Sequence, residues 1–229
     1  MQIQVESARY IRSEGEVAIT ARLSNGKSGE TFVLVVPVRF YEQSGIGVGE
    51  LSEERFEALA EEAGVHAAFK RGVRILEIAS HSKRALLRKL IEKGISKQDA
   101  EKAAQRLERF GYLNERKIAL RIAQLSLKKG WGRMRILADL RQKGYDNSAC
   151  RAVEICLDRV NFERRAARVI LKRFGGVPED EKIKQKLYRT LVNLGYSYSE
   201  IGGALTFLEE CEDLDELYRT DIMDSLCFE

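Results

Sequence analysis

Few side chains in this sequence have the types and spacing that catalysis or metal binding requires. Its histidines and cysteines are His66, His81, Cys150, Cys156, Cys211 and Cys227. No two cysteines have CxxC spacing, and neither histidine lies three to five residues from another histidine or cysteine, so a structural zinc site is not expected. Because nothing in the sequence pairs with either histidine, both are interpreted as surface or capping residues. The sequence therefore predicts no enzyme, no catalytic or metal-ligating residues and no cofactor.

Cations are the chemically informative side chains, and they concentrate in the middle of the chain. Residues 1–80 have a net charge of −3 and residues 176–229 a net charge of −8. Residues 81–175 contain 25 Lys and Arg against 10 Asp and Glu, a net charge of +15. This surplus predicts a polyanionic partner or an acidic protein groove for the centre, with acidic flanks that limit non-specific binding.

The overall composition is typical of a soluble, globular and helix-rich protein, with 44% apolar and 32% charged residues. No apolar run approaches the roughly 18 to 20 residues that span a bilayer, so no membrane association is predicted. Residues 1–6 lack the basic-then-apolar layout of a signal peptide, which predicts a cytoplasmic location.

The first 48 residues predict a small β-rich region. Residues 3–6, 17–23 and 31–38 are β-branched and partly alternating, as in strands. The pair Asn25-Gly26 predicts a hairpin turn between the second and third strands. A helical pattern then starts at Ser52, and Gly64 is expected to end this first helix.

An internal repeat of 50 to 51 residues organises most of the remaining chain. Residues 83–95, 133–145 and 184–196 each contain an apolar pair, a Leu three residues later and a Gly four residues after that Leu. This pattern predicts a helix closed by a glycine that adopts positive φ. The expected inward stripe of the first such helix is Leu86, Leu87, Leu90 and Ile91.

Each glycine is followed by a helix cap and a second amphipathic helix. The predicted caps are Ser96, Asp146 and Ser197. The apolar faces share offsets of i, i+3 and i+7, and comprise Ala100, Ala103 and Leu107, then Cys150, Val153 and Leu157, then Ile201, Ala204 and Leu208. Further helices are expected between the copies, at about 114–129 and 162–174.

The predicted fold is mainly α, with tandem three-helix repeats in an elongated, curved, solenoid-like array and a small β-rich N-terminal region. The predicted divisions are a β-hairpin or three-strand region at 1–48, connecting helices at 49–80, helical repeat 1 at 81–130, repeat 2 at 131–176, and repeat 3 with an acidic C-terminal tail at 177–229. Extended repeat surfaces suit binding along a filament or groove.

The three tandem repeats occur in this order, with the sequences FGYLNE at 110–115, KGWGR at 129–133 and LRQKG at 140–144. On these features the chain resembles the RecX family of bacterial regulators of the RecA recombinase. The resemblance covers roughly residues 80 to 210. It implies a modulator, in most members an inhibitor, that lies in the groove of the RecA–DNA filament and limits filament growth, strand exchange and co-protease activity. It also implies action in homologous recombination, DNA repair and the SOS response.

Basic residues of the repeats are the expected contacts with the RecA filament and with DNA, because flexible cations at helix ends suit phosphate contacts. Binding to single- and double-stranded DNA is expected to be weak and non-specific, and the protein is expected to be a monomer. The predicted interface residues are Arg84, Arg88, Lys89, Lys93, Lys128, Lys129, Trp131, Arg133, Arg135, Arg141 and Lys143.

Aromatic residues at the repeat boundaries have two interpretations. Trp131, between two glycines, can stack on a base or dock in a protein groove, but a packing anchor between repeats is favoured. Core or cap packing is the simpler interpretation of Tyr112, Tyr145 and Tyr196.

An independent DNA-binding protein, acting like a transcription factor, is the alternative function. It would need a recognition helix with Asn, Gln and Arg directed at base edges. The candidate helices offer mostly Ala, Glu, Lys and aliphatic residues, which disfavours sequence-specific recognition.

Overall fold

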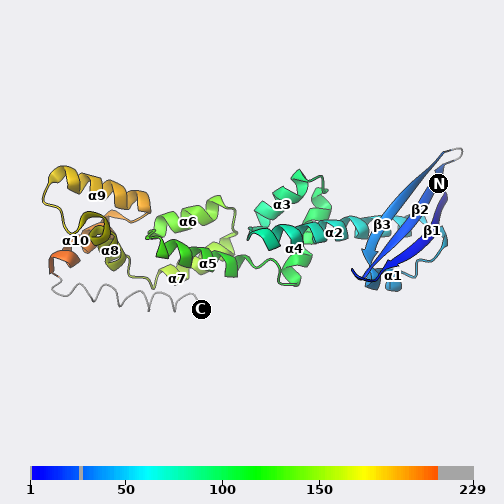
Figure 1. Cartoon of the computed structure of the whole chain (residues 1–229), viewed down its shortest axis with the longest axis horizontal. Coiled ribbons are helices and arrows are strands. Elements are labelled where there is room, and N and C mark those ends of the chain that lie inside the picture. The colour runs from blue at the N-terminus through cyan, green and yellow to red at the C-terminus, as the bar shows by residue number, and fades with distance from the viewer. Residues whose placement is uncertain (1, 26–27, 211–229) are drawn as a thin grey trace. The chain divides into compact units, whose positions relative to one another are not determined.

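The computed structural model describes residues 2–25 and 28–210, and contacts within the chain divide it into two compact units, residues 1–113 and 114–229. The described residues form a four-stranded antiparallel sheet and ten helices (Figure 1). The mainly helical class with a small β-rich N-terminal region is thus confirmed. Among the helices of these segments, none combines the length and the apolar character that crossing a bilayer requires.

The sheet of the first unit has the strand order β3-β2-β1-β4. Its strands are β1 (Gln2–Ile11), β2 (Glu16–Asn25), β3 (Ser28–Pro37) and β4 (Gly49–Leu51). Asn25 lies opposite Ser28 in the antiparallel pair of β2 and β3, so these strands form the hairpin that the sequence predicts. Residues 26 and 27 of its turn lie outside the described residues.

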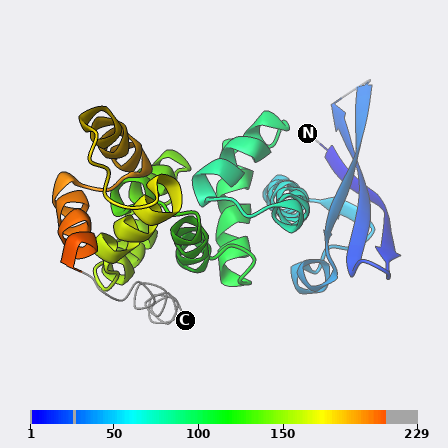
Figure 2. The same ribbon diagram turned by 60° about the vertical axis from the view of Figure 1, so that its left-hand side comes forward.

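One face of the sheet is covered by α1 (Val38–Ser44) and α2 (Glu53–Ile78), which Figure 2 shows nearly end-on beside the blue strands. The alternating residues Val17 and Ile19 of β2 are fully buried there and belong to one core with Leu59 of α2. Ala18 and Glu16, on the alternate positions, are also buried, as expected of a strand in the middle of the sheet.

The prediction that Gly64 ends the first helix is wrong, because α2 continues through it to Ile78. A Cβ atom at position 64 would lie 2.8 Å from a carboxylate oxygen of Asp99. The glycine therefore allows close approach of α4 (Lys97–Arg109). In the same way, a Cβ at Gly72 would lie 2.6 Å from Leu107. Both glycines serve helix packing, a role that their position in the sequence does not distinguish from helix termination.

The helices of the first unit form one packed group of α2, α3 (Lys83–Glu92) and α4. Leu86 and Leu90 of α3 are fully buried against Leu107 of α4. Leu87 is partly buried, whereas Ile91 is 45% exposed, so the prediction that Ile91 faces inward is wrong. The cause is that the apolar stripe of α3 is wider than the contact surface that α2 and α4 offer.

The second unit contains two further helix groups with a single shared core. In the first group, α5 (Glu115–Lys128) packs mainly on α7 (Asn147–Leu157), with α6 (Arg133–Gln142) beside them. In the second group, α8 (Phe162–Phe174) packs mainly on α10 (Tyr198–Glu210), with α9 (Glu181–Leu194) beside them. The sequence period counts α5 and α8 as the last helices of repeats 1 and 2, but by packing each is the first helix of the following group.

The predicted caps form as expected. Ser96 accepts a hydrogen bond from the Asp99 amide at 3.0 Å, and Asp146 accepts one from the Ala149 amide at 2.6 Å. Ser197 and Glu200 form a reciprocal capping box. Each satisfies amides that the first helical turn leaves without intrahelical partners.

Candidate nucleic-acid and protein interface

The cations of α3 are available on the surface of the first unit. Arg84 and Arg88 are exposed, and Lys93 caps the end of the helix. Lys89 is half-buried, and burial together with the charge of Lys89 lowers the pKa of His81. Two ion pairs involve cations of α3: Lys83 pairs with Glu108 at 2.8 Å, and Arg88 pairs with Glu92 at 3.6 Å, the latter between exposed side chains. Exposed pairs of this kind contribute about 0 to 1 kcal/mol, so this pair leaves Arg88 able to exchange partners.

The segment before α6 places two cations in solvent. Lys128 is the last residue of α5 and Lys129 is its C-terminal cap, and both are exposed. Gly130 then adopts a φ of +77°, which reverses the chain into Trp131. Lys128 and Lys129 are therefore presented at a helix end, as the sequence predicts.

Arg133 and Arg135, by contrast, make contacts within the fold. A guanidinium nitrogen of Arg133 donates to the carbonyl oxygen of Leu157 at 2.9 Å, and another pairs with Asp158. Arg135 donates to the carbonyl oxygen of Asn193 at 3.2 Å. Cations at helix C-termini satisfy carbonyl groups and interact favourably with the helix dipole. Both arginines thus stabilise neighbouring helices, whatever else they bind.

Trp131 is half-buried against the core of the second unit, which agrees with the packing role that the sequence favours. The guanidinium carbon of Arg135 lies 4.1 Å from the centre of its ring, and the Lys129 ammonium lies 5.8 Å from it. Cations over an aromatic face are attracted to its electron-rich surface. The ring therefore attracts two of the predicted interface cations, Lys129 and Arg135, to its surface.

Arg141 and Lys143 lie at the far end of α6, and both are exposed. Lys143 pairs with Asp139 at 2.7 Å, one turn earlier on the helix. The structure thus brings Lys129, Trp131 and Arg135 together, while Arg141 and Lys143 occupy the opposite end of the same helix.

In the second unit the start of α6 meets the end of α9, and this contact is called the joint between the two helix groups. The joint requires glycine at position 132, although the sequence alone gives no reason for one. The amide of Gly132 donates to the carbonyl oxygen of Leu194 at 2.7 Å, and the amide of Met134 donates to that of Gly195 at 3.1 Å. A Cβ at Gly132 would lie 2.4 Å from the Gly195 carbonyl atoms. The start of α6 therefore abuts the end of α9 through direct backbone hydrogen bonds, to which Arg135 adds a side-chain bond. In the sequence, Gly132 occupies the position that Ser82 has in repeat 1. The reason for this glycine becomes clear only when its contact with Gly195 is known.

The boundary tyrosines divide into two kinds. Tyr145 and Tyr196 are buried, and burial raises the pKa of each to about 12. The Tyr196 hydroxyl donates to the carbonyl oxygen of Gly130 at 3.2 Å. Tyr112, however, is 52% exposed and packs edge-on against Phe69 beside the more exposed Phe110. Core packing therefore describes Tyr145 and Tyr196, whereas Tyr112, near the end of α4, packs only at the surface, against Phe69.

His66 also departs from its surface interpretation. Its Nε2 atom lies 2.7 Å from an oxygen of the buried Glu16, which also pairs with Lys70. Burial acts to raise the pKa of Glu16, but the hydrogen bonds from Lys70 and His66 outweigh it and hold that pKa below its ordinary value. These residues connect β2 to α2 over about fifty positions of sequence, which is why no local spacing predicted the pairing.

Groups of three or more His, Cys, Asp or Glu side chains that could hold a metal ion are absent from the described residues. Several of the described cations lie at helix ends or on exposed helix faces, some with aromatic rings nearby. Side chains of this kind attract phosphates and carboxylates electrostatically.

Comparison with known proteins finds relatives of one kind. The chain is 33% identical over 137 residues to the regulatory protein RecX of Pelodictyon phaeoclathratiforme, covering 59% of this chain and 85% of that protein. It is 30% identical over 142 residues to the regulatory protein RecX of Cronobacter sakazakii, covering 57% and 86%. No family model matches the sequence.

Solved structures show the same fold. A crystal structure of regulatory protein RecX matches with a TM-score of 0.66 at 17% identity, covering 88% of this chain and 98% of that chain. RecX from Lactobacillus salivarius matches with a TM-score of 0.56 at 15% identity, covering 65% and 98%. These relatives are at least 30% identical to the chain and are matched over most of their length. The chain described above, with its helix groups and exposed cations, is therefore a member of the RecX family of regulatory proteins.

Proposed function

We propose that this protein modulates the RecA recombinase, and that it does so as an inhibitor. It binds in the groove of the RecA–DNA filament and limits filament growth, strand exchange and co-protease activity. Membership of the RecX family is the observation that carries this proposal. The net charge of +15 in residues 81–175 supports it, because a nucleoprotein filament presents the phosphates of its DNA to such a surface.

The exposed cations of α3 and α6 are the proposed contacts. Arg84, Arg88 and Arg141 are exposed and lie outside the core, so they can reach a partner. Lys128 and Lys129, at the end of α5, are also exposed and are proposed as further contacts. Binding to single- and double-stranded DNA is proposed to be weak and non-specific, because these side chains suit phosphates and not base edges.

The test is RecA ATP hydrolysis on single-stranded DNA, with the protein titrated in at sub-stoichiometric ratios. Progressive inhibition at low ratios is the expected result, because a few monomers then stop the extension of each filament. No effect on hydrolysis, together with tight binding to bare duplex DNA, would instead favour an independent DNA-binding protein.

A charge-reversed variant locates the interface. Arg84→Glu with Arg88→Glu is expected to weaken inhibition strongly while leaving helicity unchanged, because both side chains are exposed. The matched control is Arg71→Glu with Arg74→Glu, which makes the same change in charge at exposed positions of α2. Equal inhibition by both double variants would exclude α3 from the interface.

Arg133 and Arg135 are left intact in this experiment. Their loss would also remove hydrogen bonds to the carbonyl groups of Leu157 and Asn193. A weakened variant would then report either lost binding or lost stability, and the two effects could not be separated.

A further inference from the structure

A second cationic surface lies on α9, outside the residues assigned to the RecA interface. This helix contains four cations, Lys182, Lys184, Lys186 and Arg189, and one acid, Glu181. Within the described residues no ion pair engages any of the four cations. Their charge is therefore not neutralised by ion pairs within the part of the chain that the structure describes.

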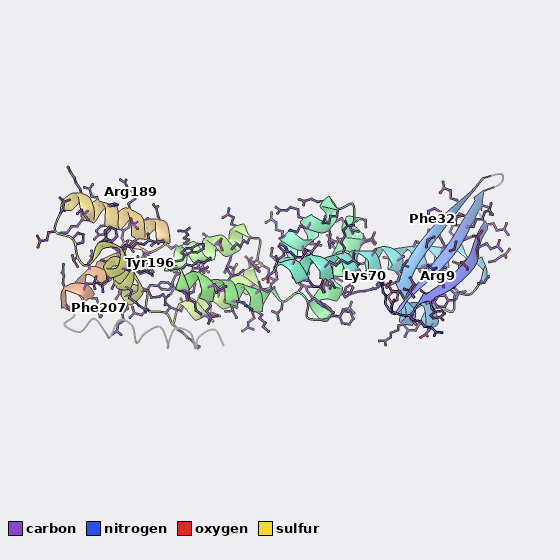
Figure 3. The ribbon with its side chains drawn as sticks, in the orientation of Figure 1. Arg9, Phe32, Lys70, Arg189, Tyr196 and Phe207 are labelled. Carbon is purple, nitrogen blue, oxygen red and sulfur yellow. The ribbon has the colours of Figure 1, made fainter. Side chains whose placement is uncertain are left out.

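Three of these cations share one face of the helix. Lys182, Lys186 and Arg189 are spaced i, i+4 and i+7, and all three are exposed. Figure 3 shows Arg189 on the outer side of α9, whereas Tyr196 lies among the neighbouring helices. The face forms a cationic line that successive phosphates of a nucleic acid strand can follow.

Two stacked tyrosines lie on a different face of α9, the face that also bears Lys184, one turn before Tyr188. The rings of Tyr188 on α9 and Tyr198 on α10 are nearly parallel, with an interplanar angle of 27° and centroids 6.1 Å apart. Tyr188 is half-buried and supports the pair, whereas Tyr198 is 70% exposed. Tyr198 is held in place as the first residue of α10, within the capping box that Ser197 and Glu200 form. An exposed aromatic ring fixed in this way loses little conformational freedom when it binds a partner.

We propose that Tyr198, supported by Tyr188 on the same face of α9 as Lys184, binds single-stranded nucleic acid by stacking on its bases. A ring can stack only on a base that is not already enclosed in a duplex, while cations contact the phosphates on either side. An acidic protein surface would use the cations but would leave the aromatic stack without a specific partner. The inference rests on the proposed function and deepens it, because it adds a site for single-stranded nucleic acid on a surface separate from α3.

The test measures binding of a fluorescently labelled oligothymidylate to the full chain by anisotropy. Tyr198→Ala is expected to lower the affinity by about 5- to 150-fold, the effect of losing one base–aromatic stack. Tyr198→Phe keeps the ring and is expected to bind like the wild type. Tyr112→Ala is the matched control, because it removes an exposed aromatic residue from the first unit. Binding to a duplex of the same length should be insensitive to all three changes.

Salt dependence separates stacking from charge. Lys184→Gln should reduce the slope of log affinity against log salt by about 0.7, the value for one lost phosphate contact on a single strand. Tyr198→Ala should lower affinity at every salt concentration without changing that slope. A change of slope in Tyr198→Ala would mean that the ring only positions cations, which contradicts the proposed stacking.

Assay of the same variants on RecA ATP hydrolysis keeps the two proposals distinguishable. If Tyr198→Ala binds oligothymidylate like the wild type but inhibits RecA less, the tyrosines face RecA, and the nucleic acid site is overturned while the proposed function stands. If the wild type has no effect on RecA but Tyr198→Ala loses binding to the oligonucleotide, the proposed function fails and the site remains. Equal affinity of Tyr198→Ala and the wild type overturns the site in either case.

Discussion

The start of α3 and the start of α6 occupy the same place in the repeat but are completed in different ways. At α3, the hydroxyl of Ser82 accepts a hydrogen bond from the Ala85 amide, so the helix is capped by its own sequence. At α6, Gly132 offers no side-chain cap, and the amides of Gly132 and Met134 donate to the last carbonyl groups of α9. One helix start is satisfied locally, and the other needs a second helix.

The difference shows how a single residue decides whether neighbouring helix groups join through their backbones. A side chain at position 132 would collide with Gly195, because its Cβ would lie only 2.4 Å from the carbonyl atoms of that residue. Ser82 has such a side chain, so α3 cannot start in the same geometry. The joined ends of α6 and α9 also place opposite ends of two helix dipoles together, which is favourable. Repetition of sequence therefore does not guarantee repetition of the joint.

Equivalent core substitutions near the two helix starts should lower the free energy of unfolding by similar amounts, so they serve as the control for the comparison. Leu90 of α3 and Leu140 of α6 hold equivalent positions, and both are fully buried. Replacement of either by Ala is expected to lower the free energy of unfolding by about 2 to 5 kcal/mol, the cost of lost burial and a cavity. Urea unfolding monitored by circular dichroism measures both changes. A loss below about 1 kcal/mol in only one variant would contradict equivalent cores.

The closing glycines should behave differently, and this is the sharpest test of the joint. Gly94 and Gly195 are equivalent and adopt φ values of +83° and +92°. Gly94→Ala should cost about 1 to 2 kcal/mol for the left-handed backbone alone, because its Cβ would meet no atom within 4 Å. Gly195→Ala should cost about 1 to 3 kcal/mol more, because its Cβ would lie 2.4 Å from the Arg135 amide nitrogen.

The measurement for the glycine pair is the same urea titration, with tryptophan fluorescence as a second signal. Trp131 is the single tryptophan of the chain, so its emission reports the second unit. Gly195→Ala should move the fluorescence transition to lower urea, and Gly94→Ala should leave it in place. Equal unfolding free energies for the two variants would show that the joint contributes nothing.

The smallest expected effect is an acid-dependent loss of stability in the first unit. The pKa of Glu16 is lowered in the folded protein by Lys70 and His66 in spite of burial, so the folded state binds the proton less readily than the unfolded chain. This contribution to stability is present above the unfolded pKa, near 4.5, and is lost as the pH falls through the lower folded pKa. Glu16→Gln should remove this pH dependence.

An acid titration with two signals checks the prediction. Because Trp131 lies in the second unit, the loss due to Glu16 should appear in circular dichroism without a matching change in tryptophan fluorescence. The control is Glu92→Gln, which removes a carboxylate from an exposed ion pair on α3. The same acid dependence in Glu16→Gln and in the wild type would rule out this ion-pair network as its origin.

Local patterns in the sequence predicted much of the fold, because their physical causes are local. The caps at Ser96, Asp146 and Ser197 form with the amides three residues later, and the two helices expected between the repeats lie at α5 and α8. The strands of the hairpin are those that alternate in the sequence. These features depend on the backbone geometry of a few consecutive residues, which side-chain type controls directly.

The failures occurred where a residue responds to a distant one. Gly64 does not end a helix, because its lack of a side chain leaves room for Asp99. His66 is paired, because Glu16 of the sheet lies next to it in the fold. Among the predicted interface residues, the internal roles of Arg133 and Arg135 left no trace in the sequence pattern. A cation and a carbonyl group separated by more than twenty residues give no periodic signal.

The amino-acid sequence alone predicts the helical repeats, their caps, the N-terminal strands, the central concentration of positive charge and the resemblance to RecX. The folded structure is needed to show which glycines join helices, which arginines bond to carbonyl groups, and that Tyr188 and Tyr198 stack. This difference follows from the range of each interaction. Helix periodicity and capping act within one or two turns, whereas close packing and hydrogen bonding between helices depend on which surfaces the fold brings within a few ångströms of each other.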